Sequence, residues 1–124
     1  MIVRRFCELW STLDLNGDLK PLLDFFTDDA VYHNIPVDPV VGVEGIRSTV
    51  HMFSAGVDHM EFRVLGIAAD GPTVMTERVD AFTLADGRTI ELPVMGTFEV
   101  KDGRIAAWRD YFDLNQFMSQ MAPS

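Results

Sequence analysis

Three Asp-Gly pairs in the second half of the chain constrain its fold more than any other feature. They are Asp70-Gly71, Asp86-Gly87 and Asp102-Gly103, and they separate four long runs in which apolar residues alternate. Asp-Gly between such runs is a strong signal for a tight hairpin turn. The runs therefore predict consecutive antiparallel strands, at 60–69, 73–84, 89–101 and 104–113.

Outside these four runs, the sequence predicts helices and one strand. Apolar residues recur at helical intervals over three segments, and a short strand precedes two prolines that exclude a helix or a central strand. The expected helices span 2–15, 19–26 and 45–55, with a strand over 30–34, a loop over the core at 35–42 and a short final helix at 114–121.

Helices followed by a curling antiparallel meander are typical of an α+β domain with one sheet face covered by helices. The 124 residues suffice for one domain, over 1–124. We therefore expect a single α+β domain with a curved sheet packed against N-terminal helices.

Charge and composition exclude several classes of protein. The net charge of −9, from 19 acidic and 10 basic residues, disfavours nucleic-acid binding. No apolar run approaches the ~20 residues that span a membrane, and the N-terminal sequence lacks a secretory pattern. We expect a cytoplasmic protein that does not bind a membrane, in which Cys7, the single cysteine, packs in the core.

Polar side chains lie among apolar neighbours on the expected strands. Because side chains alternate between the faces of a strand, Arg78 and Asp80 share one face, and Tyr32 and Asn34 share a face of another strand. Asp110 lies on the same face as two aromatic neighbours, Trp108 and Phe112. These faces predict partly buried carboxylates around one pocket.

A buried carboxylate needs a partner or a proton, and the five donors of Arg78 can bridge both aspartates. From spacing alone two alternatives stay open: a purely structural ion network, and a role for Tyr32 and Asn34 in holding the proline-rich loop. The three histidines show no metal-ligand spacing, so we expect no metal and no cofactor.

An unbroken apolar face over 90–100 could form the wall of a cavity. We expect a hydrophobic substrate to contact the apolar residues of this strand and of the last one. The candidates are Leu92, Val94, Phe98, Trp108 and Phe112.

Three segments resemble the limonene-1,2-epoxide hydrolase family. They are Tyr-His-Asn-Ile-Pro from 32 to 36, Thr-Glu-Arg-Val-Asp from 76 to 80, and Gly-Arg-Ile-Ala-Ala-Trp-Arg-Asp-Tyr-Phe-Asp-Leu from 103 to 114. Their order and separations are similar to the family's over nearly the whole chain. The resemblance implies a cystatin-like or nuclear transport factor-like fold, cone-shaped around a deep apolar pocket, in a homodimer.

The resemblance also implies roles for five residues in one-step epoxide hydrolysis without a metal or a covalent intermediate. Tyr32, Asn34 and Asp110 would hold the attacking water, with Asp110 as the base. Asp80 would protonate the epoxide oxygen, and Arg78 would bridge the two aspartates. The expected reactants are water and a terpenoid, cyclic or steroid-like epoxide, and the product is a vicinal diol.

Two other kinds of function stay open on this scaffold, because one fold hosts many activities. One is a ketosteroid-isomerase-like enzyme or a polyketide or epoxide cyclase. The other is a domain that binds an apolar ligand without catalysis.

Overall fold

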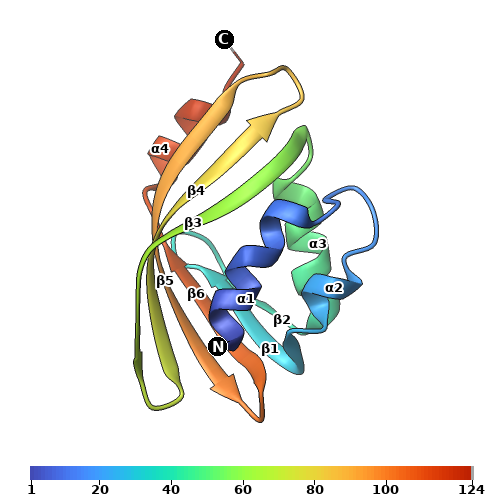
Figure 1. Cartoon of the computed structure of the whole chain (residues 1–124). Coiled ribbons are helices and arrows are strands. Elements are labelled where there is room, and N and C mark those ends of the chain that lie inside the picture. The colour runs from blue at the N-terminus through green and yellow to red at the C-terminus, as the bar shows by residue number, and fades with distance from the viewer. Residues whose placement is uncertain (124) are drawn as a thin grey trace.

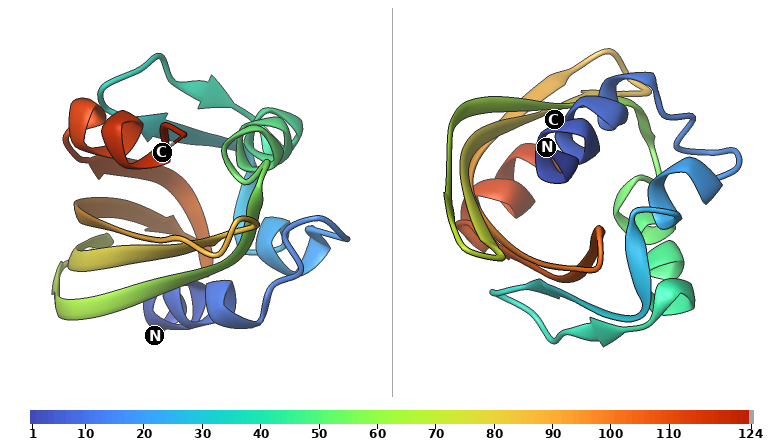
Figure 2. Two further views of the ribbon diagram at one scale, coloured as in Figure 1. Left: turned by 90° about the horizontal axis from the view of Figure 1, so that it is seen from above. Right: turned by 60° about the horizontal axis from the view of Figure 1, so that its bottom comes forward.

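The chain folds around one curved six-stranded sheet. The structure, a computed structural model, describes residues 1–123. The strands lie in the order β2-β1-β6-β5-β4-β3, and every neighbouring pair is antiparallel except β1 and β6, which are parallel. The sheet curls into an open ring, with α1 (Ile2–Leu9) seated in its opening (Figure 1; Figure 2, right). The expected α+β class is confirmed.

Four long strands form the expected hairpins: β3 (Val57–Asp70), β4 (Thr73–Leu84), β5 (Thr89–Lys101) and β6 (Arg104–Tyr111). At the last turn both Asp102 and Gly103 have positive φ, 52° and 78°. Two successive residues of this kind form the turn whose twist matches that of paired strands, which explains the Asp-Gly pair at this turn. At the other two turns only the glycines, Gly71 and Gly87, have positive φ. β3 begins earlier than the pattern predicted, and β6 ends two residues sooner.

The first helix is shorter than its apolar periodicity predicted. α1 ends at Leu9 and is followed by a 3-10 turn, η1 (Trp10–Thr12), whereas the sequence predicted a helix to residue 15. The hydroxyls of Ser11 and Thr12 donate to the carbonyl oxygens three residues before them, at 3.0 Å in both cases. Such local bonds compete with helix continuation. Leu13 and Leu15 still reach the core, from an irregular segment.

The second helix is also shorter than predicted, and the last residue expected in it, Phe26, begins a strand. α2 covers only Lys20–Leu23, and β1 runs over Phe26–Asn34, four residues earlier than predicted. Phe26 pairs with Ile105 of β6, so tertiary pairing outweighs the local helical pattern.

The proline-rich segment is a surface loop with a short edge strand, β2 (Val40–Val41), beside β1. Residues 36–39 are exposed, and Val40 packs against the core, so only the end of the segment contacts the core as expected. α3 (Val43–Phe53) follows, two residues before its predicted start, and α4 (Leu114–Met121) has the predicted bounds.

The core lies between the concave face of the sheet and the first three helices. Phe6 of α1 is fully buried, and its ring makes edge contacts with six other aromatic rings, including those of Trp10 and Trp108. Cys7 is buried beside it, as predicted. Among the described residues, no helix is long and apolar enough to span a membrane.

Candidate active site

The site is built around Arg78 and Asp80 on β4, whose side chains point to the concave face of the sheet. Arg78 is 1% exposed and Asp80 is 4% exposed. Arg78 Nε donates to Asp80 Oδ1 at 2.9 Å, and Nη2 donates to Oδ2 at 2.8 Å. The two residues thus form a bidentate ion pair, the geometry in which a guanidinium binds a carboxylate most strongly.

Asp110 on β6 binds the other edge of the same guanidinium. Nη1 of Arg78 donates to its Oδ1 at 3.1 Å, and Nη2 donates to its Oδ2 at 2.9 Å. The indole Nε1 of Trp108 donates a third bond, to Oδ1 at 2.8 Å. Asp110 therefore accepts three hydrogen bonds from protein donors, and Asp80 accepts two.

Tyr32 and Asn34 reach the site because β1 pairs in parallel with β6. In this register Tyr32 lies beside Trp108, and Asn34 lies beside Asp110. The rings of Tyr32 and Trp108 stack at 4.0 Å with an angle of 9°. All five polar residues singled out in the sequence therefore gather at one place.

The charges of the site favour one shared proton. Arg78 carries one positive charge between two carboxylates, so protonation of one carboxyl gives a neutral cluster. Burial raises the pKa of Asp80 to about 6, against the opposing effect of Arg78 and with a further rise from Asp110. Asp80 therefore takes up a proton as the pH falls through about 6.

Burial and the charge of Asp110 both raise the pKa of the Tyr32 phenol. Burial, and next the negative charge of Asp110, raise its pKa above the ordinary value, although a hydrogen bond with Asn34 opposes this. The phenol therefore stays protonated and can donate a hydrogen bond.

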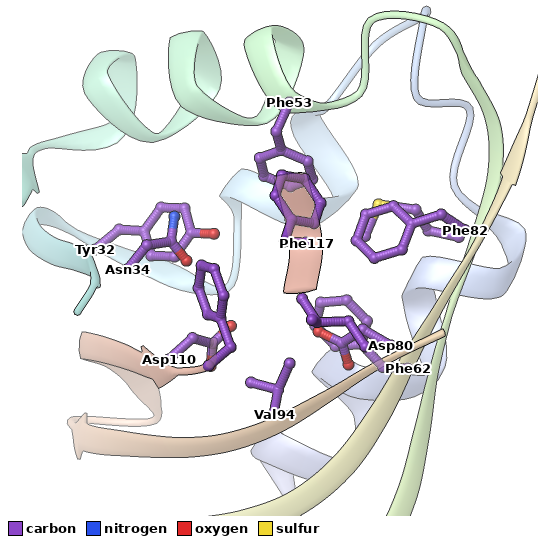
Figure 3. A pocket seen from close by; sticks show the side chains of 12 residues that line it. Tyr32, Asn34, Phe53, Phe62, Asp80, Phe82, Val94, Asp110 and Phe117 are labelled. Atoms are coloured by element: carbon purple, nitrogen blue, oxygen red, sulfur yellow. The ribbon is translucent and has the colours of Figure 1, made fainter. Parts of the chain in front are cut away.

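A cavity of about 80 Å³ adjoins these groups. Figure 3 shows Tyr32, Asn34 and Asp110 on one side of it and Asp80 on the other. The apolar lining comes from β3, β4, β5, α3 and the C-terminal segment. It consists of Phe53, Met60, Phe62, Phe82, Leu92, Val94, Phe112 and Phe117.

Three of the five residues expected to contact substrate line this cavity, namely Leu92, Val94 and Phe112. The placement of Phe98 and Trp108 there is wrong. Both are fully buried behind the polar cluster, where their rings stack at 6.0 Å. They share a strand face with the lining residues, but the helices cover their part of that face.

Sequence reasoning missed the lining residues of β3, α3 and α4. Met60 and Phe62 share one face of β3, and Phe82 shares a face of β4 with Asp80. The alternation of side chains along these strands could have indicated all three. Phe53 and Phe117 lie on helices, and no sequence pattern relates them to the sheet. Within residues 1–123, no three His, Cys, Asp or Glu side chains are grouped to hold a metal ion.

The fold and the polar cluster define a class: an α+β protein of the nuclear transport factor-like type with a paired-carboxylate site beside an apolar cavity. Within this class, the chain belongs to the limonene-1,2-epoxide hydrolase family, since the model of the limonene-1,2-epoxide hydrolase catalytic domain matches residues 2–123. The resemblance seen in the sequence is confirmed.

A mycobacterial sequence and a solved mycobacterial structure are similar to this chain. Epoxide hydrolase EphG of Mycobacterium tuberculosis is 39% identical over 99 residues, which cover 80% of this chain and 65% of EphG. The chain thus matches just under two thirds of the length of this relative. The solved structure of an M. tuberculosis LEH-like epoxide hydrolase is 30% identical, with a TM-score of 0.78, and the match covers 97% of this chain and 86% of that one.

Similarity of fold extends beyond the family. The structure of a putative polyketide cyclase from Xanthomonas campestris pv. campestris has a TM-score of 0.83 at 21% identity, and the match covers 98% of this chain and 94% of that one. At this identity the similarity concerns the fold alone.

The buried ion network predicts a large effect of removing its cation. The substitution Arg78→Gln should lower the free energy of unfolding by about 3–5 kcal/mol at pH 8, because it leaves two buried carboxylates facing each other. The loss should be smaller at pH 5, where a proton can neutralise one of them. Denaturant unfolding at both pH values measures this.

Arg63→Gln is the matched control. Arg63 pairs with Glu61 and Glu91 on the surface, so its loss should cost less than about 1 kcal/mol at either pH. Equal effects of the two substitutions would show that the buried Arg78 network contributes no more to stability than the surface pairs of Arg63.

Proposed function

We propose that this protein hydrolyses a hydrophobic epoxide to a vicinal diol. The observation that carries the proposal is a pair of carboxylates on opposite sides of one apolar cavity (Figure 3). A single arginine, Arg78, bridges them. Epoxide opening needs a proton donor for the oxygen and a base for the attacking water, and this pair offers one of each. Membership of the epoxide hydrolase family supports the same reaction.

In the proposed mechanism the five polar residues act on a single water and a single epoxide. Tyr32, Asn34 and Asp110 hold the water, and Asp110 accepts its proton as the water oxygen attacks an epoxide carbon. The carbon–oxygen bond of the ring breaks, and Asp80 gives its proton to the leaving oxygen. Arg78 holds both carboxyl groups in place.

The mechanism leaves a neutral diol and a site with its proton moved from Asp80 to Asp110. A proton transfer between the two carboxyls, or through water, restores the starting state. No step needs a metal, a cofactor or a covalent bond to the enzyme.

The lining of the cavity favours a hydrophobic substrate. Eight of its twelve lining residues are apolar, and five of these are phenylalanines. Such a lining suits a terpenoid, cyclic or steroid-like epoxide. Hydrolysis of epoxides of graded size, with an enone as a test for isomerase chemistry, identifies the substrate class.

Removal of either carboxylate should abolish most of the activity. Asp80→Asn and Asp110→Asn should each lower kcat by about 10²–10⁴-fold, the usual contribution of a positioned acid or base, while circular dichroism stays unchanged. The exposed Asp70, the last residue of β3, gives the control Asp70→Asn, which should keep full activity. Near-normal turnover by either site variant would refute the mechanism.

The activity should fall as the pH rises. Asp80 must carry a proton to act as the acid, and its pKa lies at about 6, so kcat/KM should decline above that value by up to about tenfold per pH unit. Initial rates between pH 5 and pH 9, corrected for spontaneous hydrolysis, measure this. A rate that increases between pH 6 and pH 8 would contradict the role of Asp80.

A direct attack by water makes an isotopic prediction. In a single turnover in water enriched in oxygen-18, the label should appear in the diol and not in the protein. Mass spectrometry of peptides containing Asp80 and Asp110 checks this. Label in either aspartate would indicate an ester intermediate instead.

We propose further that two copies of this chain associate through the outer face of the sheet. Met75, Met95 and Tyr111 project from that face, with exposed fractions of 53%, 52% and 46%, and Met95 pairs with Tyr111 across β5 and β6. An exposed apolar cluster of this kind is typical of an interface.

A single charge on this face should therefore disrupt the dimer. Met95→Lys should give a monomer in sedimentation equilibrium at concentrations where the wild type is dimeric. Met52→Lys, at an exposed position of α3, should leave the dimer intact. A wild-type protein that stays monomeric at high concentration would refute the proposal.

A further inference from the structure

The guanidinium of Arg78 has a fifth N–H donor that neither aspartate uses. Four of its five N–H bonds point to Asp80 and Asp110. The remaining hydrogen on Nη1 points to Thr76 Oγ1, at 3.3 Å between the heavy atoms. Thr76 is 1% exposed and does not line the cavity. The cation is thus fully hydrogen-bonded only because Thr76 is there.

The orientation of the Thr76 hydroxyl suits it to accept this bond. A hydroxyl group has one hydrogen and two lone pairs. Thr76 Oγ1 donates its hydrogen to the carbonyl oxygen of Gly96 at 3.2 Å. Its lone pairs are therefore free to accept from Arg78, and the donor–acceptor direction is fixed.

The guanidinium fits between Thr76 and Asp110 because the residue between them has no side chain. Thr76, Gly96 and Asp110 lie in one row across β4, β5 and β6. A Cβ atom at Gly96 would overlap Arg78 Nη1, and would lie 2.7 Å from Asp110 Oδ1 and 3.0 Å from Thr76 Oγ1. Gly96 has ordinary backbone geometry, so the space above it, and not its φ angle, is what the site requires.

We propose that Thr76 and Gly96 are positioning residues that together form a seat for the guanidinium of Arg78. Gly96 provides the room, and Thr76 provides the third point of attachment beside the two aspartates. Neither residue touches the substrate cavity. Their effect on turnover, which rests on the function proposed above, comes through the placement of Asp80 and Asp110 by Arg78.

The first test replaces the hydroxyl of Thr76 by a methyl group of the same size. Thr76→Val leaves a buried N–H of a cation without an acceptor, so kcat should fall about tenfold or more. KM should change by less than about twofold, because Thr76 makes no contact with the cavity. Thr76→Ser restores the hydroxyl and should restore most of kcat.

Thr83→Val is the matched control, on the same strand. Thr83 is half-buried and its hydroxyl makes no hydrogen bond among the described residues, so kcat and KM should not change. A purely structural role of Thr76 predicts a different result: lower thermal stability with kcat retained in the folded fraction. That result would overturn the proposal.

The second test uses the room above Gly96. Gly96→Ala should displace the guanidinium and lower kcat more than Thr76→Val does. The control is Gly66→Ala, on β3, where an added Cβ meets nothing within 4 Å. Unchanged turnover by Gly96→Ala would refute the role of Gly96.

A readout independent of activity separates this proposal from the proposed function. Protein labelled with nitrogen-15 in arginine gives guanidinium NMR signals, and those of Arg78 are assigned by their absence in Arg78→Gln. The Nη1 signal should be shifted or broadened in Thr76→Val and Gly96→Ala, but not in the two controls.

The proposed function and the positioning role of Thr76 and Gly96 can fail separately. If the wild type hydrolyses no epoxide while the Nη1 signal responds as expected, the proposed function is refuted and the positioning role is supported. If Thr76→Val leaves the Nη1 signal and kcat unchanged, the positioning role is refuted, whatever the substrate.

Discussion

One buried positive charge between two carboxylates determines how the rest of the molecule is arranged. Burial lowers the pKa of Arg78, but Asp110 and Asp80 outweigh this effect and hold it well above the ordinary value. The ring of Phe62 covers the guanidinium, with 4.4 Å between the guanidinium carbon and the ring centroid. Charged groups so far from water must be fully satisfied by protein partners. Strands β4 and β6 must therefore keep their register through β5, because a shift of one residue would turn one carboxylate to the outer face.

The packing of the core and the geometry of the site depend on the same residue, Trp108. Its ring stacks on Tyr32 and on Phe98, with interplanar angles of 9° and 12°, while its Nε1 donates to Asp110. An indole held between other rings cannot rotate easily, so the N–H that it offers has a fixed direction. The aromatic core thus provides rigidity at the point where the proposed base needs it.

Much of this arrangement could be predicted from the sequence, because it depends on local rules. Turn chemistry at the Asp-Gly pairs predicts the hairpins, and alternation along a strand predicts that Arg78 and Asp80 share a buried face. The parallel pairing of β1 with β6 has no local signal, and Tyr32 and Asn34 could be joined to the site only through the family resemblance. Phe98 and Trp108 were misplaced for a related reason: alternation gives the face of a strand but not what covers each part of it. The role of Gly96 depends on a neighbour's side chain, which no pattern within β5 reveals.

The parallel pairing of β1 and β6 has a consequence for the order in which the molecule forms. Strands β3 to β6 are joined by tight turns, so their contacts close short loops, whereas the contact of Asn34 with Asp110 closes a loop that contains β3, β4 and β5. Long loops cost more entropy to close and form more slowly than hairpins. By this argument Tyr32 and Asn34 join the site after the hairpins have formed, when the first long strand meets the last. A chain that has made its hairpins but not this contact has the two bridged carboxylates without the phenol and the amide beside them.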